Sequence, residues 1–168
     1  MADYKLVHTE CARQDCSVVS TQFPLCPAHT LLENGLEVKT STIPGAGDGL
    51  FFMGYVLEDG TRVDTLKKGA FITYYSGYEN LSAKEYDSRF PERTSYGFQC
   101  NETCLDSGPS DNYPGRYINH KPFSKSNVRW GTTVCQISDR YATPMYALKS
   151  IKAGKELFVD YGRQYWKK

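Results

Sequence analysis

The sequence predicts a mostly β, α+β domain built from many short strands. Apolar and aromatic segments of about four to eight residues recur along the chain, and several alternate with period two, as half-buried strands do. Turn signals such as Asn34-Gly35 and Asp59-Gly60 separate these segments. Only one segment, which starts near Ser82, carries a clear helix signal. The three observations together favour small sheets with little helix.

The strands are expected from residue 36 onward, at residues 36–39, 50–57, 61–63, 70–75, 95–100, 128–137, 144–148 and 157–159. Ser82 and Glu85 form a capping box, which predicts a short helix running toward Phe90 and stopped by Pro91. Residues 104–115 are rich in glycine, proline, aspartate and asparagine, so we expect a loop there.

The composition is that of an ordinary soluble globular protein. With 168 residues, 40% hydrophobic and 23% charged, the chain suits one domain with at most a small appendage. A net charge of +1 argues against a broad basic surface for nucleic acid or anionic lipid. There is no apolar run of about 18 residues, so we expect no membrane span. Residues 1–7 lack the apolar stretch of a secretory signal, which favours an intracellular protein.

Three of the six cysteines lie in the first 26 residues, and a histidine follows them. In a reducing compartment such a cluster favours thiols or a metal over disulfides. Four nitrogen and sulfur ligands suit a closed, structural Zn²⁺ site, and the short loop from Cys26 to His29 would let both side chains face one ion. The candidate ligands are Cys11, Cys16, Cys26 and His29. His8 competes for the histidine position, and three buried thiols with a surface histidine are the alternative.

Three further segments carry more information than their composition. Residues 43–51 hold three glycines within five positions, so the backbone must turn tightly or approach something closely. Residues 116–120 read RYINH, and residues 154–162 read GKELFVDYG. The motif YSG, residues 75–77, lies between the first two. In this order the segments resemble the SET domain, a family of S-adenosylmethionine-dependent protein lysine methyltransferases, over roughly residues 36–166.

The resemblance implies a fold of small curved sheets with a C-terminal pseudoknot. In that fold the last segment passes through a loop formed by the second motif, which would bring Asn119 and His120 beside Tyr161. Residues 78–96 resemble the variable insert that forms one wall of the substrate groove. The expected organisation is a zinc-binding segment at residues 1–35, a SET domain at 36–162 and an aromatic tail at 163–168.

The resemblance also implies where S-adenosylmethionine binds. The backbone of the glycine loop would hold the methionine end, and the Asn-His pair would contact the amino acid and adenine parts. Asp48 departs from the basic or aromatic residue that is common in the family, so we expect its side chain to face solvent or the amino group. The tail would cover the adenine, with a frayed tail as the alternative. The implied cofactor-binding residues are Ala46, Gly47, Asp48, Gly49, Tyr96, Asn119, His120, Tyr161 and Trp166.

By the same resemblance, Tyr161 matches the tyrosine at the methyl-transfer site and Tyr75 the channel tyrosine opposite it. Among 13 tyrosines, sheet packing is the alternative for any one of them. A lysine, with a pKa of about 10.4, must lose a proton before it attacks, and an apolar channel beside a sulfonium favours that loss. Val159 stands where the family often has phenylalanine or tyrosine, which implies room for di- or trimethyllysine. The implied channel residues are Tyr75, Val159 and Tyr161.

The implied substrate is a protein or peptide that bears a lysine, with a histone tail as the expected example and the nucleus as the favoured compartment. Two other hypotheses stay open. One is a catalytically silent SET module that binds a peptide. The other is an interaction module built on the zinc segment, where only Lys5 and Arg13 are cationic, so nucleic acid is poorly supported as its partner.

Overall fold

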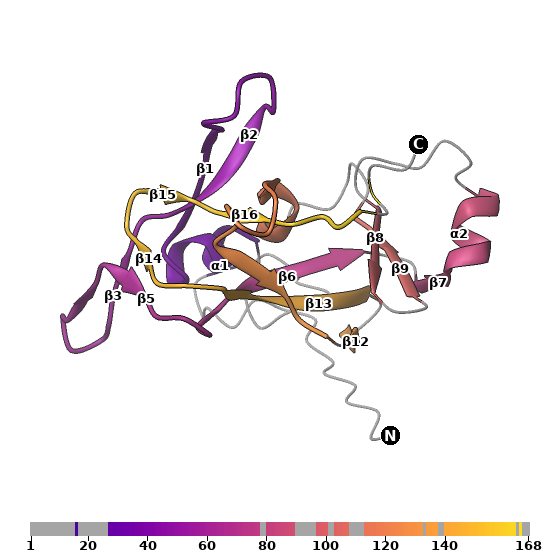
Figure 1. The fold of residues 1–168 in the computed structure, drawn as a ribbon. Helices are drawn as coiled ribbons and strands as arrows, with labels where there is room; N and C mark the ends of the chain where they lie inside the picture. Colours follow the sequence, from indigo (N-terminus) through magenta and orange to yellow (C-terminus); the bar gives the residue numbers. More distant parts are fainter. Residues whose placement is uncertain are drawn as a thin grey trace.

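The structure, a computed structural model, describes residues 16, 27–77, 80–89, 97–100, 103–107, 113–132, 134–137, 140–163 and 165. This part of the chain is mostly β, as the sequence predicted, with two short α-helices and one 3₁₀ turn (Figure 1). None of the helices in the described ranges is long and apolar enough to cross a membrane.

The helical elements in these ranges are α1 (Pro27–Glu33), α2 (Ala83–Arg89) and η1 (Pro114–Tyr117). The strands are β1 (Leu36–Thr40), β2 (Asp48–Phe52), β3 (Tyr55–Val56), β4 (Arg62–Val63), β5 (Thr65–Leu66), β6 (Phe71–Gly77), β7 (Asn80–Ser82), β8 (Gly97–Cys100), β9 (Thr103–Asp106), β10 (Asn119–His120), β11 (Val128–Trp130), β12 (Cys135–Ile137), β13 (Arg140–Ala147), β14 (Ile151–Lys152), β15 (Lys155–Glu156) and β16 (Phe158–Val159).

The long antiparallel pair β6–β13 runs through the middle of the molecule. Helix α2 and the β7–β9–β8 sheet lie at one end of this pair, β3, β5 and β14 lie toward the other, and the β1–β2 hairpin projects above that half (Figure 1). The main apolar core gathers side chains from β1, β2, β6, β13 and the C-terminal segment. It includes Leu50, Phe52, Ile72, Ile118, Met145 and Leu157, each nearly or fully buried. Burial of this apolar surface is the chief stabilising contribution to the fold.

The C-terminal strand β16 lies between β10 and β11 in the largest sheet. It runs parallel to both neighbours, with Phe158 opposite Asn119 and Val159 opposite both His120 and Val128. Strands β10 and β11 are the two ends of one loop. The C-terminal segment passes between these two ends, so it is threaded through the loop. This is the threaded arrangement that the SET resemblance implied, and it is rare among proteins in general.

The side chain of Asn127 forms hydrogen bonds with the backbone of the threaded segment, as a neighbouring strand would. Its Nδ2 donates to the carbonyl oxygen of Glu156 at 2.8 Å, and its Oδ1 accepts from the backbone N–H of Phe158 at 2.7 Å. The backbone N–H of Asn127 also donates to the Phe158 carbonyl oxygen at 3.1 Å. These bonds satisfy backbone groups of the C-terminal segment that would otherwise be buried without partners.

Two local predictions are wrong. Residues 27–29, expected as part of a loop, are instead the start of α1, which Pro27 opens and which is stabilised by packing of Leu31 against the core. The expected loop at residues 104–115 begins with strand β9, because this segment pairs with both β7 and β8. In each case a contact with a distant part of the chain decides the local structure.

Two expected strands are each divided in the structure. The segment at residues 50–57 turns at Gly54, whose φ of 83° favours glycine and whose Cβ would lie 2.8 Å from the Val63 carbonyl oxygen. The segment at residues 128–137 forms β11 and β12, which both pair with β13. The capping box is confirmed, because Ser82 and Glu85 exchange hydrogen bonds at the start of α2.

Candidate active site

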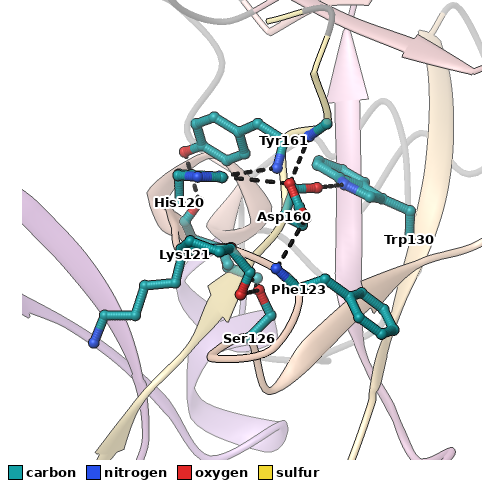
Figure 2. Close-up of polar contacts among 10 residues, drawn as sticks. His120, Lys121, Phe123, Ser126, Trp130, Asp160 and Tyr161 are labelled. Carbon is teal, nitrogen blue, oxygen red and sulfur yellow. Dashed lines mark hydrogen bonds and ion pairs between the residues drawn. The ribbon is translucent and has the colours of Figure 1, made fainter. Parts of the chain in front are cut away.

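The threaded strand delivers Tyr161 beside β10. The backbone N–H of Tyr161 donates to Nδ1 of His120 at 3.1 Å, and the phenol donates to the carbonyl oxygen of Ile118 at 2.8 Å. The two rings lie 5.3 Å apart between their centroids, and both residues are half-buried. Figure 2 shows the tyrosine ring directly beside the imidazole. The structure therefore places the phenol next to the Asn119–His120 pair.

Asp160 fixes the turn that precedes Tyr161. One carboxylate oxygen accepts from the backbone N–H of Phe123 at 2.9 Å, and the other accepts from the N–H of Gly162 at 2.8 Å (Figure 2). The nearer carboxylate oxygen stands 3.9 Å from Nδ1 of His120, which is beyond hydrogen-bonding distance. That nitrogen instead accepts a hydrogen bond from the backbone N–H of Tyr161.

Trp130 contacts both Tyr75 and Asp160, the residue directly before Tyr161. Its indole N–H donates to the carbonyl oxygen of Asp160 at 2.8 Å. Its ring meets the ring of Tyr75 edge to face, with centroids 5.4 Å apart. Tyr75 is only 7% exposed and belongs to the main core, and both Trp130 and Tyr161 pack against it. Sequence reasoning missed the tryptophan.

Val159 lies inside the largest sheet and belongs to the core that also contains Tyr75. Its side chain is 1% exposed and is part of the main core, between His120 and Val128 in the strand register. The position is therefore interior, where the volume of the side chain determines how much space its neighbours leave.

The glycine loop with its flanking residues connects β1 to β2 and spans residues 41–49. Asn119 links this loop to the site, because its Nδ2 donates to the carbonyl oxygen of Asp48 at 2.9 Å. The Asp48 side chain is exposed, which agrees with the solvent-facing alternative. Gly47 has a φ of 73°, a left-handed conformation that favours glycine, and a Cβ there would meet nothing within 4 Å. The backbone around Ala46 and Gly47 is thus open to an approaching molecule.

Glu156 is a buried acid at the base of this loop that sequence reasoning missed. It is 5% exposed, and its carboxylate accepts hydrogen bonds from Ser41, Thr42 and Asn119. Burial disfavours the charged carboxylate, but these hydrogen bonds outweigh burial and hold the pKa of Glu156 below its ordinary value. The C-terminal motif also holds Lys155 and Asp160, so nothing local in the sequence distinguishes Glu156 as the buried charge.

Four of the predicted site residues, Tyr96, Trp166, Cys11 and Cys26, lie outside the described residues. Of the remaining two zinc candidates, His29 lies in α1 and both Cys16 and His29 are half-buried. Within the described ranges no group of three histidine, cysteine or acidic residues is arranged to hold a metal ion. Because half of the expected ligands are not among those residues, the zinc site stays a prediction.

A model of the SET-domain family matches residues 63–162, which is more than half of the chain. The chain belongs to the SET-domain family. The match includes the YSG, RYINH and GKELFVDYG motifs, and the described SET fold carries the threaded strand that the resemblance implied. A search of curated protein sequences gives no match.

Several solved structures share this SET fold. The ctPRC2 structure in an autoinhibited conformation bound to S-adenosylmethionine is 23% identical over 77% of this chain and 15% of that chain, with a TM-score of 0.51. The Chaetomium thermophilum polycomb repressive complex 2 is 22% identical over 80% of this chain and 16% of its own, with a TM-score of 0.53. An active polycomb repressive complex 2 in the basal state is 25% identical over 77% of this chain and 15% of that chain, with a TM-score of 0.52.

The chain therefore spans only 15% to 16% of the length of these matched chains. At this level of identity the likeness to the first two supports the fold, and the chemistry must be argued from the residues of this chain.

The buried carboxylate gives the site a measurable pH dependence. Because its pKa is lowered on folding, charged Glu156 adds to stability at neutral pH, and that contribution is lost as pH falls from the ordinary glutamate range, about 4.3, through the lower folded value. The loss of stability caused by Glu156→Gln should therefore be greater at pH 7 than near about pH 3. Urea unfolding at both pH values measures it, with the exposed Glu37→Gln as a control. An equal loss at both pH values contradicts this account.

Proposed function

We propose that this protein is an S-adenosylmethionine-dependent protein lysine methyltransferase. The observation that carries the proposal is the position of the Tyr161 phenol, which donates to the carbonyl of Ile118 directly before the Asn119–His120 pair. Membership of the SET-domain family and the likeness to ctPRC2, a protein solved with S-adenosylmethionine bound, support it.

The glycine loop and Asn119 suit the methionine end of the cofactor. The exposed backbone around Gly47 leaves open space for a ligand, and Asn119 already bonds to the loop through Asp48. Backbone N–H groups in such a loop favour a carboxylate. His120, in contact with Tyr161, would border the adenine side. S-adenosylmethionine, when bound, supplies a methyl group on a positively charged sulfonium.

The aromatic side chains of Tyr75, Trp130 and Tyr161, which all pack in or against the main core, suit the lysine side of the reaction. An apolar environment beside a positive sulfonium would disfavour the ammonium form of the lysine, so the amine would release its proton to solvent water without a general base. A phenol with an ordinary pKa of about 10 is a poor base at neutral pH. Tyr161 instead acts by position. Its hydroxyl donates a hydrogen bond to the carbonyl oxygen of Ile118, so the lone pairs of the phenol oxygen can face the polarised methyl group.

The proposed substrate is a lysine in a protein or peptide, with a histone tail as the first candidate and hence a nuclear location. Tyr161→Phe should lower turnover by about a hundredfold or more, because one electrostatic group at a transition state typically contributes that much. Incorporation of labelled methyl into a histone-peptide array measures it, and thermal unfolding reports whether the variant is folded. Tyr55→Phe, on β3, is the matched control. Unchanged turnover in Tyr161→Phe would refute the role of the phenol.

Val159 is proposed to set the product. Its small buried side chain leaves more room beside the transfer site than phenylalanine would, so the wild type should form di- or trimethyllysine. Val159→Phe should stop at monomethyllysine, and mass spectrometry of the product at long reaction times distinguishes the two. Only monomethyl product from the wild type would overturn this assignment.

A structural Zn²⁺ held by Cys11, Cys16, Cys26 and His29 is also proposed. Pro27 starts α1 directly after Cys26, so His29 lies in the first turn of the helix, close in sequence to its neighbouring ligand. Elemental analysis of the purified protein should find about one zinc per chain, and chelation should lower the unfolding temperature. Protein that is folded and free of metal would exclude the site.

A further inference from the structure

We infer that Glu156 is a positioning residue for the cofactor: its carboxylate fixes the base of the glycine loop against Asn119, so that loop and asparagine meet the cofactor as one preorganised surface. The inference rests on the proposed function and assigns a role to a residue that does not itself touch the cofactor. The evidence lies in the contacts of the carboxylate, in the way the loop is held and in the space around Gly49.

Each carboxylate oxygen of Glu156 accepts two hydrogen bonds. Oε1 accepts from Ser41 Oγ at 2.6 Å and, at the longer distance of 3.4 Å, from Asn119 Nδ2. Oε2 accepts from the backbone N–H of Thr42 at 2.7 Å and from the Thr42 hydroxyl. A nearly buried acid with four donors around it has a defined orientation, because rotation would leave donors and a charge unpaired in the interior.

These contacts hold a loop whose tip bonds mostly to itself. The N–H of Ser41 donates to the carbonyl of Gly47 at 2.9 Å, and the N–H of Ala46 donates to the carbonyl of Ile43 at 3.1 Å. The side chain of Glu156 fixes one leg of the loop at Thr42, and Asn119 fixes the other leg at Asp48. The proposed cofactor-binding backbone between these legs is exposed.

Gly49 shows how closely the two anchors approach the loop. A Cβ at this position would lie 2.3 Å from Oε1 of Glu156 and 3.3 Å from Nδ2 of Asn119. Real side chains do not come so close, so the carboxylate occupies the space that any other residue would need. The glycine at 49 is therefore explained by the acid behind it, whereas Gly47 has open space around its Cα.

The same C-terminal segment carries Glu156 and Tyr161. Its backbone is tied to the loop hairpin, because β15 pairs with β2 and the N–H of Leu157 donates to the carbonyl of Leu50 at 2.7 Å. Five residues later the chain presents the phenol at the transfer site. One segment thereby sets both the loop for the methionine end and the residue that faces the methyl group, which links cofactor position to reaction geometry.

Glutamine in place of Glu156 tests this role with little change of shape. Its amide keeps one acceptor oxygen but turns an NH₂ group toward donors, so the loop loses part of its anchor. With saturating peptide, Glu156→Gln should raise the KM for S-adenosylmethionine about tenfold, the size expected for one lost bond to a charged group. The kcat at saturating cofactor should change less than about threefold, because the transfer site is intact.

Calorimetric titration with S-adenosylhomocysteine gives the corresponding dissociation constants directly. Glu37→Gln, an exposed glutamate on β1 of the same sheet, is the matched control and should bind as the wild type does. If Glu156→Gln does not fold, Thr42→Val, which removes one hydroxyl donor to the same carboxylate, should weaken binding in the same direction.

The outcomes separate the two claims. If the wild type binds no S-adenosylhomocysteine and methylates no peptide, the proposed function fails. If the wild type binds and the Glu156 and Thr42 variants bind equally well, or if kcat falls while KM stays unchanged, the positioning role fails while the proposed function stands.

Discussion

Strand β16 lies between β10 and β11, and hydrogen bonds from both neighbours keep it there. The side chain of Asn127 spans the threaded segment, with one bond to the carbonyl of Glu156 and one to the N–H of Phe158. Three features of the candidate site follow from this insertion. It places the Tyr161 phenol beside the carbonyl oxygen of Ile118 and fixes the turn at Asp160. It also positions the Asp160 carbonyl oxygen, which accepts from the indole N–H of Trp130.

The side chains of Glu156, Asp160 and His120 in the site are buried or half-buried, and each has defined hydrogen-bond partners. Glu156 stays charged in a nearly buried position because hydroxyl, amide and backbone donors surround it. Asp160 uses both oxygens on backbone N–H groups and leaves the imidazole of His120 as an acceptor for Tyr161. Preorganised groups of this kind need not reorient when charge develops during a reaction, which is the usual source of electrostatic catalysis.

Much of the fold and part of the site could be predicted from the sequence. The resemblance to the SET domain implied the threaded strand, and it selected Tyr161, Asn119 and His120, which the structure brings together. Glu156 and Trp130 could not be selected in this way. The partner Ser41 lies 115 residues from Glu156, and the acceptor for Trp130 belongs to a residue 30 positions later. Contacts at such separations leave no local pattern, and the same reason explains the wrong predictions at α1 and β9.

A crystal structure of the protein with S-adenosylhomocysteine tests the central claim most directly. The account predicts the ligand between the glycine loop and the Asn119–His120 pair, with its sulfur facing the phenol of Tyr161 and β16 still seated between β10 and β11. A ligand bound elsewhere, or a Tyr161 hydroxyl turned away from both the sulfur and the carbonyl of Ile118, would contradict it.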